Sequence, residues 1–169
     1  MKKVLLLSAI ALVTLGVKAQ DDKSKRPSPP AKVSETTSSG TVITIDYSQP
    51  AVKGREIGKD IAPYGKVWRT GANEATVFEV SKDVKIEGKS LPAGKYGLYS
   101  IPGKDEWTFI FNKTWKQWGT KYEEADDALR VNVKTGKAPA FTERMTFNVE
   151  KNGKVSLFWG NDKVDFTVK

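Results

Sequence analysis

Short segments of β-branched and aromatic residues recur along most of the chain, separated by clusters of Gly, Pro, Asn and Asp. This pattern is typical of antiparallel β structure. It predicts an all-β fold, either an antiparallel β-sandwich or an open barrel, with about eight or nine strands and little helix. Only 114–127 could hold a turn or two of helix. The expected strands are 41–47, 76–80, 84–87, 95–101, 106–111, 128–134, 143–150, 154–159 and 163–168.

The alternation of apolar and polar residues in the C-terminal third predicts how its strands pair. A two-residue turn at Asn152-Gly153 would place the apolar residues of the two flanking strands on opposite faces. A three-residue loop at 151–153, with Gly153 in the left-handed region, brings them to one face. The loop then pairs Val149 with Val155, Phe147 with Leu157, and Met145 with Trp159. A second turn, at 161–162, is expected to extend this face over a third strand that needs a covering layer.

The N-terminus has the features of a signal peptide. Met1-Lys2-Lys3 precedes an apolar run over 4–17, and Ala19 completes a small-residue cleavage site, which predicts a signal peptide at 1–19. The apolar run is shorter than the roughly 20 residues that span a bilayer. The mature protein is therefore expected to be exported, either periplasmic or secreted, with no transmembrane segment. No lipid anchor is expected, because the chain has no cysteine.

The rest of the chain divides into two parts. Residues 20–28 are rich in polar residues and Pro, so we expect a flexible leader there. Residues 29–169 are expected to form a single β-sandwich domain, since this length suffices for one packed core.

Charge and composition exclude several functions. The formal net charge of +8 falls to +5 once the signal peptide with its three lysines is removed, and the remaining lysines are scattered, so no nucleic acid partner is expected. The chain has no histidine and no cysteine. This excludes Ser–His pairs, thiol nucleophiles and most metal sites. We expect no cofactor and no metal, and we assign no catalytic residue. Carboxylate chemistry remains open, and the acids best placed for it are Asp46, Glu74 and Glu79.

The stretch 47–76 has little periodicity, and irregular connections of this length tend to be functional or disordered. Arg55 and Arg69 could present planar forks to an anion, Trp68 could offer a stacking face, and Asn73 and Glu74 could add polar contacts. The alternative is structural. In that interpretation Trp68 plugs one end of the fold, and Arg69 pairs with Glu74 or Asp46.

A second aromatic group, made up of Trp107, Trp115, Trp118 and Tyr122, is a further candidate site, and Trp107 in it is expected to belong to the core. Trp115 and Trp118 lie three positions apart, so one helical turn would place them side by side, where they could stack on a sugar ring. The alternative is that both cover an open edge of the sandwich.

Three runs of the sequence resemble a known family: 46–55, 63–76 and 91–96, with the string from Trp68 to Thr76 (WRTGANEAT) the most specific. They resemble the exported bacterial family catalogued as domain of unknown function 2911, over most of the chain from about residue 29. Position 49 departs from the family pattern, with Gln49 in place of arginine. The resemblance implies an envelope or secreted protein of Gram-negative type, and it implies no particular activity.

These observations lead to one leading hypothesis and two alternatives. The first is an exported, non-catalytic protein that binds a small ligand, a glycan or an envelope protein through 54–76, with Trp115 and Trp118 as further contacts. The second is a carboxylate-dependent hydrolase acting on glycans. The third is an envelope assembly or scaffolding factor with an exposed apolar surface.

Overall fold

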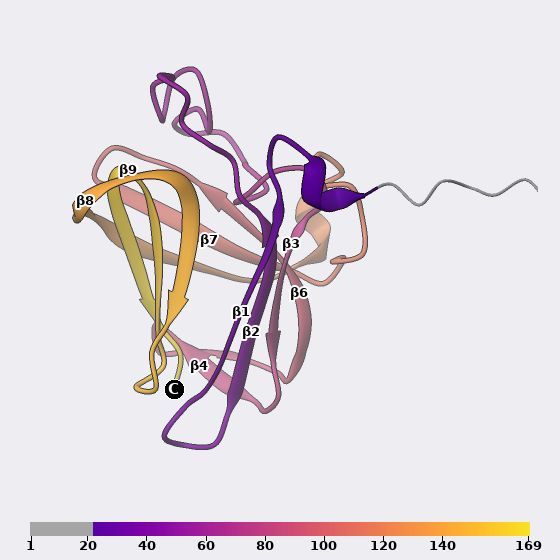
Figure 1. Cartoon of the computed structure of the whole chain (residues 1–169). Coiled ribbons are helices and arrows are strands. Elements are labelled where there is room, and N and C mark those ends of the chain that lie inside the picture. Colours follow the sequence, from indigo (N-terminus) through magenta and orange to yellow (C-terminus); the bar gives the residue numbers. More distant parts are fainter. Residues whose placement is uncertain (1–21) are drawn as a thin grey trace, which may run out of the picture.

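The computed structural model describes residues 22–169 and shows an all-β protein, as predicted (Figure 1). The predicted signal peptide, 1–19, and the first two residues of the predicted leader lie outside the described residues. Two short 3-10 helices are present, η1 (Lys23–Lys25) and η2 (Glu124–Asp126). No helix within residues 22–169 has the length and apolar character needed to cross a membrane. The strands are β1 (Pro30–Thr36), β2 (Val42–Ser48), β3 (Thr76–Val80), β4 (Val84–Ile86), β5 (Lys89–Leu91), β6 (Gly94–Ile101), β7 (Glu106–Asn112), β8 (Asp127–Val149) and β9 (Lys154–Thr167).

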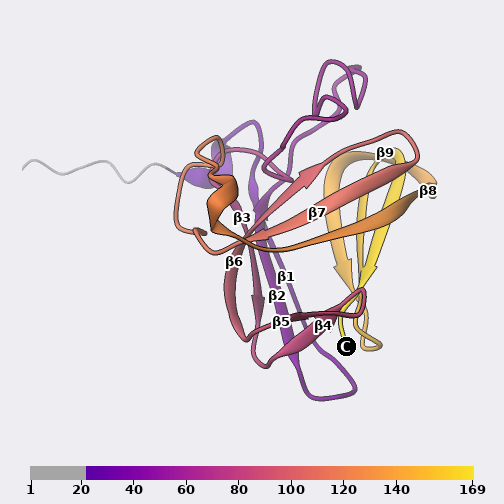
Figure 2. The same ribbon diagram turned by 180° about the vertical axis from the view of Figure 1, so that it is seen from behind.

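Seven of these strands form one antiparallel sheet in the order β1-β2-β3-β6-β7-β8-β9, while β4 and β5 form a separate hairpin. The sheet curls, so that β8 and β9 lie across the interior from β1, β2 and β3 (Figures 1 and 2). Residues leaving β2 meet β8 at the curled edge: the Val52 amide donates to the Glu143 carbonyl over 2.9 Å, and the Met145 amide donates to the Pro50 carbonyl over 3.0 Å. These bonds partly close the sheet into a barrel.

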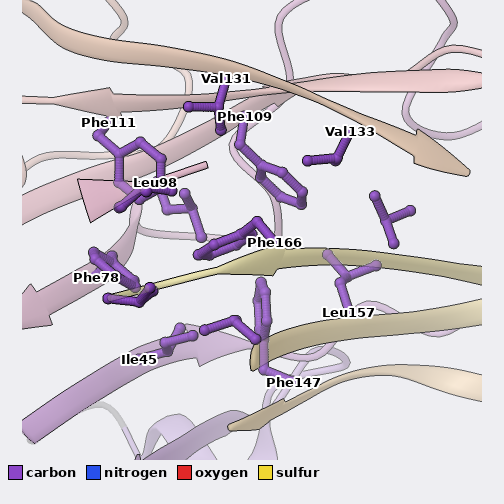
Figure 3. Close-up of a cluster of buried hydrophobic side chains, with 14 of the residues drawn as sticks. Ile45, Phe78, Leu98, Phe109, Phe111, Val131, Val133, Phe147, Leu157 and Phe166 are labelled. Carbon is purple, nitrogen blue, oxygen red and sulfur yellow. The ribbon is translucent and has the colours of Figure 1, made fainter. Parts of the chain in front are cut away.

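The interior of this curled sheet is apolar and aromatic. Side chains from both sides of the curl meet in it, and Phe166 of β9 lies in ring contact with Phe78, Phe109 and Phe111 (Figure 3). All four rings are buried. The inward-facing set labelled in the close-up is Ile45, Phe78, Leu98, Phe109, Phe111, Val131, Val133, Phe147, Leu157 and Phe166.

The predicted C-terminal hairpin is confirmed. Gly153 has a φ of +84°, which glycine adopts without the steric cost that a Cβ would bring. Val149 pairs with Val155, and Phe147 pairs with Leu157. The register shifts between Thr142 and Thr146, beyond these pairs. The single apolar face that the pattern predicted is therefore real.

The predicted turn at 161–162 is wrong. β9 runs through these residues as one strand, and Gly160, with a φ of +59°, marks a bend instead of a reversal. Beyond the bend Val164 pairs with Thr135 of β8. The expected strands 128–134 and 143–150 are likewise one strand, β8. Alternation identifies which residues face inward, but it cannot distinguish a chain that bends from one that turns back.

β1 was not predicted, and its composition explains why. Its residues alternate between exposed and half-buried, and none is buried. It pairs with β2 at one edge of the sheet, where a strand needs little apolar surface. The β5 strand, only three residues long, was also not predicted.

Candidate functional site

The segment 67–76 enters the site region through Trp68, whose backbone pairs with Ser100 of β6 by two hydrogen bonds of 2.7 and 2.8 Å. The indole of Trp68 stacks on Trp159 with ring centroids 5.0 Å apart and meets Trp107 edge-on. Trp68 thus packs against the main core. The structural interpretation is correct for this residue, because its ring is engaged with two buried tryptophans.

Thr70, which follows Arg69, holds a strained backbone conformation. Its φ is +47°, a region that a β-branched residue rarely occupies and that costs of order 1–3 kcal/mol. Thr70 is fully buried, and its hydroxyl donates to the Ser100 hydroxyl over 2.9 Å. Its carbonyl accepts from the Thr76 hydroxyl over 2.9 Å. These contacts hold the strained backbone in place and so fix the direction in which Arg69 leaves it.

Arg69 makes no hydrogen bond or ion pair with any residue of the described part of the chain, and its Nε is buried without an acceptor. Burial lowers the pKa of its guanidinium, although an arginine stays charged near neutral pH. The side chain lies against Gly119, where a Cβ would stand 2.2 Å from Arg69 Cδ. Glycine is therefore required at 119 to admit the arginine side chain.

Arg69 lines a cavity of about 320 Å³ between the segment 67–69, Tyr99 of β6 and the loop that follows β7. The other lining residues are Val67, Trp68, Tyr99, Gly119, Thr120 and Tyr122. Arg69 is the only charged residue among them. The cavity therefore combines one positive charge with aromatic residues in a wall that is mostly polar.

The two tyrosine hydroxyls of this cavity are engaged elsewhere. Tyr99 donates to the Lys121 carbonyl over 3.2 Å and accepts from Gln117 over 3.0 Å. Tyr122 donates to Asp127 over 2.7 Å. Burial, together with this bond to Asp127, raises the pKa of Tyr122 to about 12. Neither phenol is ionised near neutral pH, so neither neutralises Arg69.

Glu74 does not pair with Arg69. Its carboxylate accepts from Lys23 over 2.8 Å and from Arg26 over 3.1 and 3.0 Å. The Lys23 bond is the main reason that the pKa of Glu74 falls to about 2. Asp46 pairs instead with Lys32, over 3.2 Å. The predicted structural pairing of Arg69 with Glu74 or Asp46 is therefore wrong, because both acids bind cations from the N-terminal part of the chain.

Asn73 connects the site to its surroundings, while Arg55 lies apart from it. The Asn73 side chain donates to the Ser28 carbonyl over 3.1 Å, and its own carbonyl accepts from the Gly119 amide over 3.0 Å. Arg55 is exposed and donates to the carbonyls of Val52 and Ala51, over 3.1 and 2.7 Å. Arg55 therefore stabilises its own loop.

Trp115 and Trp118 do not form the expected pair on a helical turn, because the loop that carries them is not helical. The Trp115 ring lies 5.3 Å from the Lys95 ammonium. Trp118 is 48% exposed and its backbone pairs with Glu74. Trp118 therefore remains available at the surface, beside the Glu74 segment.

The three candidate acids, Asp46, Glu74 and Glu79, show no arrangement that favours hydrolysis. Asp46 and Glu74 line a second cavity of about 180 Å³ together with Lys23 and Arg26, and Glu79 pairs with Lys95. A glycosidase needs one carboxyl group that keeps its proton near neutral pH, whereas the pKa of Glu74 is lowered. Within residues 22–169, no group of three or more acids is placed to hold a metal ion.

The sequence pattern of one protein family matches residues 28–168, a range that includes Arg69 and every residue lining its cavity. The chain belongs to the DUF2911 family. That family is described as "Protein of unknown function (DUF2911)", which confirms the resemblance of the three sequence runs and names no activity. Comparison with curated proteins and with solved structures gives no match.

Three residues that line the Arg69 cavity of this DUF2911 protein were not predicted from the sequence: Tyr99, Gly119 and Thr120. Tyr99 lies in β6, and the other two lie in the loop after β7. Their chemistry is ordinary, and only their position beside Arg69 gives them a role. Of the three, only Gly119 could have been suspected from the sequence, because a glycine next to a tryptophan in a loop can mark the close approach of another segment.

Proposed function

We propose that this DUF2911 protein is an exported, non-catalytic binding protein whose Arg69 cavity holds a small molecule bearing a carboxylate. One observation carries the proposal: a half-buried guanidinium without an acceptor among residues 22–169 lines a cavity. A buried polar group that lacks a partner is costly and asks for an explanation. A bound anion would supply the missing acceptor through charge-assisted hydrogen bonds.

The charge and the walls of the cavity favour one class of anion. A single arginine balances one negative charge, as on a carboxylate, better than the nearly doubled charge of a phosphate monoester. Tyr99 and Tyr122 offer aromatic surface to the carbon skeleton of such a ligand, and aromatic rings bury a large apolar area on contact. Sugar acids belong to this class, which agrees with a glycan-derived ligand.

The strained Thr70 supports binding at this place. Backbone strain persists where surrounding contacts enforce it, and it is concentrated at functional sites. Here the strain lies next to the residue whose charge has no partner. No observation of comparable weight supports the hydrolase or the scaffolding alternative.

An NMR titration tests the proposal, with D-glucuronate as the probe and D-glucose as the neutral control that lacks the carboxylate. Glucuronate should shift the Arg69 Nε–H resonance, and glucose should not. Arg69→Gln should weaken glucuronate binding about tenfold or more, which is the effect of losing a charge-assisted hydrogen bond. Lys66→Gln removes an exposed charge nearby and serves as the matched control, with affinity expected within about twofold of wild type.

Two results would reject the proposal. One is a response to glucose as large as the response to glucuronate, which would show that the charge plays no part. The other is glucuronate binding that survives Arg69→Gln, or no binding by the wild-type protein of either glucuronate or acetate, the smallest carboxylate with a carbon skeleton.

A further inference from the structure

The residues 22–29, called here the N-terminal strap, are attached to the site segment by polar contacts. Lys23 and Arg26 bind Glu74, and the Ser28 carbonyl accepts from Asn73. None of the three η1 residues is buried. Figures 1 and 2 both place η1 beside the loop between β7 and β8. Further along the strap, the Pro27 carbonyl accepts from Arg144 and the Pro29 carbonyl accepts from the Gln49 amide. The strap therefore rests on the surface, and its bonds to two consecutive residues, Asn73 and Glu74, join it to the site segment.

The same two residues hold one wall of the Arg69 cavity. The Asn73 carbonyl accepts from the Gly119 amide, and the backbone of Glu74 pairs with Trp118. Gly119 in turn lies against the Arg69 side chain. A short path of contacts thus leads from the strap through Asn73 and Gly119 to the guanidinium.

Asn73 is the residue on this path most dependent on its partners. Its φ is +61°, a conformation that asparagine tolerates better than most residues but still adopts at some cost. Its side chain is bonded to the strap and its carbonyl to the cavity wall. Loss of the strap would remove one of these two constraints, and the position of Gly119 would then be less well fixed.

We infer that docking of the strap and binding of an anion at Arg69 favour each other, so that the strap regulates the proposed site. This inference rests on the proposed function. Coupling of this kind is reciprocal: if the docked strap tightens anion binding, the bound anion must hold the strap more firmly by the same factor. Lys23 and Arg26 supply the side-chain bonds that join the strap to Glu74, so they are the residues to change in a test.

The first experiment measures glucuronate affinity in the double variant Lys23→Gln/Arg26→Gln. We expect affinity to fall about fivefold or more, the lower end of typical coupling between sites. Lys25→Gln is the matched control, because Lys25 lies on the same turn and pairs only with the exposed Asp22 in the ion pairs of residues 22–169. Its affinity should stay within about twofold of wild type.

Glu74→Gln separates coupling from simple charge effects. Loss of two cations would weaken anion binding by electrostatics alone, and loss of a nearby acid would strengthen it. Coupling through the strap predicts that Glu74→Gln weakens glucuronate binding, since the strap loses its acceptor. Tighter binding by Glu74→Gln would overturn the inference.

Reciprocity supplies a second measurement. Trypsin can cleave the strap after Lys23 and Lys25, and saturating glucuronate should slow both cleavages in wild type but not in Arg69→Gln. The inference is overturned if glucuronate affinity is unchanged in Lys23→Gln/Arg26→Gln while binding still depends on Arg69. That result leaves the proposed function standing. Absence of Arg69-dependent binding in the wild-type protein rejects both together.

Discussion

The irregular connection between β2 and β3 has two halves, and each contains an arginine. The two arginines differ in whether their guanidinium groups have hydrogen-bond acceptors. In 54–66 the chain bonds mainly to itself: Arg55 donates to carbonyls a few positions earlier, and Tyr64 donates its amide to Gly58. In 67–76 the chain bonds to other parts of the fold, and Arg69 is left without an acceptor among the described residues.

The contrast shows that the role of an arginine depends on whether carbonyl or carboxylate oxygens lie within hydrogen-bond distance of its guanidinium. Arg55 is exposed, and carbonyls within its own loop satisfy it. Arg69 stands next to the strained Thr70 and lines a cavity whose two tyrosine hydroxyls are already engaged. The two residues look alike in the sequence, and only the second lacks an acceptor among residues 22–169.

The largest expected effect is a loss of stability on substitution in 67–76. It tests whether this half is anchored in the core while 54–66 is not. Trp68→Ala removes a ring that stacks on Trp159, and it should cost about 3 kcal/mol, the lower end for a tryptophan lost from a core. Tyr64→Ala, at a side chain 43% exposed, should cost about 1 kcal/mol or less. Urea denaturation measures both, and equal losses would show that the halves are anchored alike.

A smaller effect compares the two arginines directly. Arg55→Gln removes two hydrogen bonds to backbone carbonyls, so the free energy of unfolding should fall by about 1 kcal/mol. Arg69→Gln removes a partly desolvated charge that has no partner within residues 22–169, so stability should stay within about 0.5 kcal/mol or rise. A substantial loss of stability for Arg69→Gln would mean that Arg69 serves the fold.

The last effect concerns Glu74, which lies in the second half, 67–76, and binds Lys23 and Arg26. The contribution of this contact to stability should depend on pH. The folded-state pKa of Glu74 is about 2, below its ordinary value of 4.5. A lowered folded pKa stabilises the protein above about pH 4.5, and this contribution is lost as pH falls toward 2. Because the Glu74 side chain is 39% exposed, solvent limits the contribution to about 1 kcal/mol. Unfolding of wild type and Glu74→Gln at pH 7 and pH 3 measures it, and an equal pH dependence in both proteins would contradict the assignment.

The fold was predictable where the strands alternate between apolar and polar residues and only one loop length between them agrees with that alternation. Gly153 fixes the C-terminal hairpin because only one loop length brings Val149 and Val155 to the same face. The same reasoning failed at 161–162, since a bend at Gly160 also keeps Val164 facing inward. Local pattern thus determines faces, and the strand partners depend on the whole sheet.

The site was predictable only in part. The string from Trp68 to Glu74 stood out as unusual, and it does carry Arg69. Which acid pairs with which cation depends on segments distant in sequence, and the partners of Glu74 lie in a stretch expected to be a flexible leader. The cavity itself comes from the approach of Gly119 to Arg69, an event of tertiary packing that no spacing in the sequence encodes.

The contact between the residues after β2 and the distal half of β8 has a consequence for the order of folding. Gln49 and Met145, bonded there, are 96 positions apart in the chain. Such long-range closure makes folding slow, since the loop must be ordered before its contacts form. The core cannot be completed until β8 and β9 have left the ribosome.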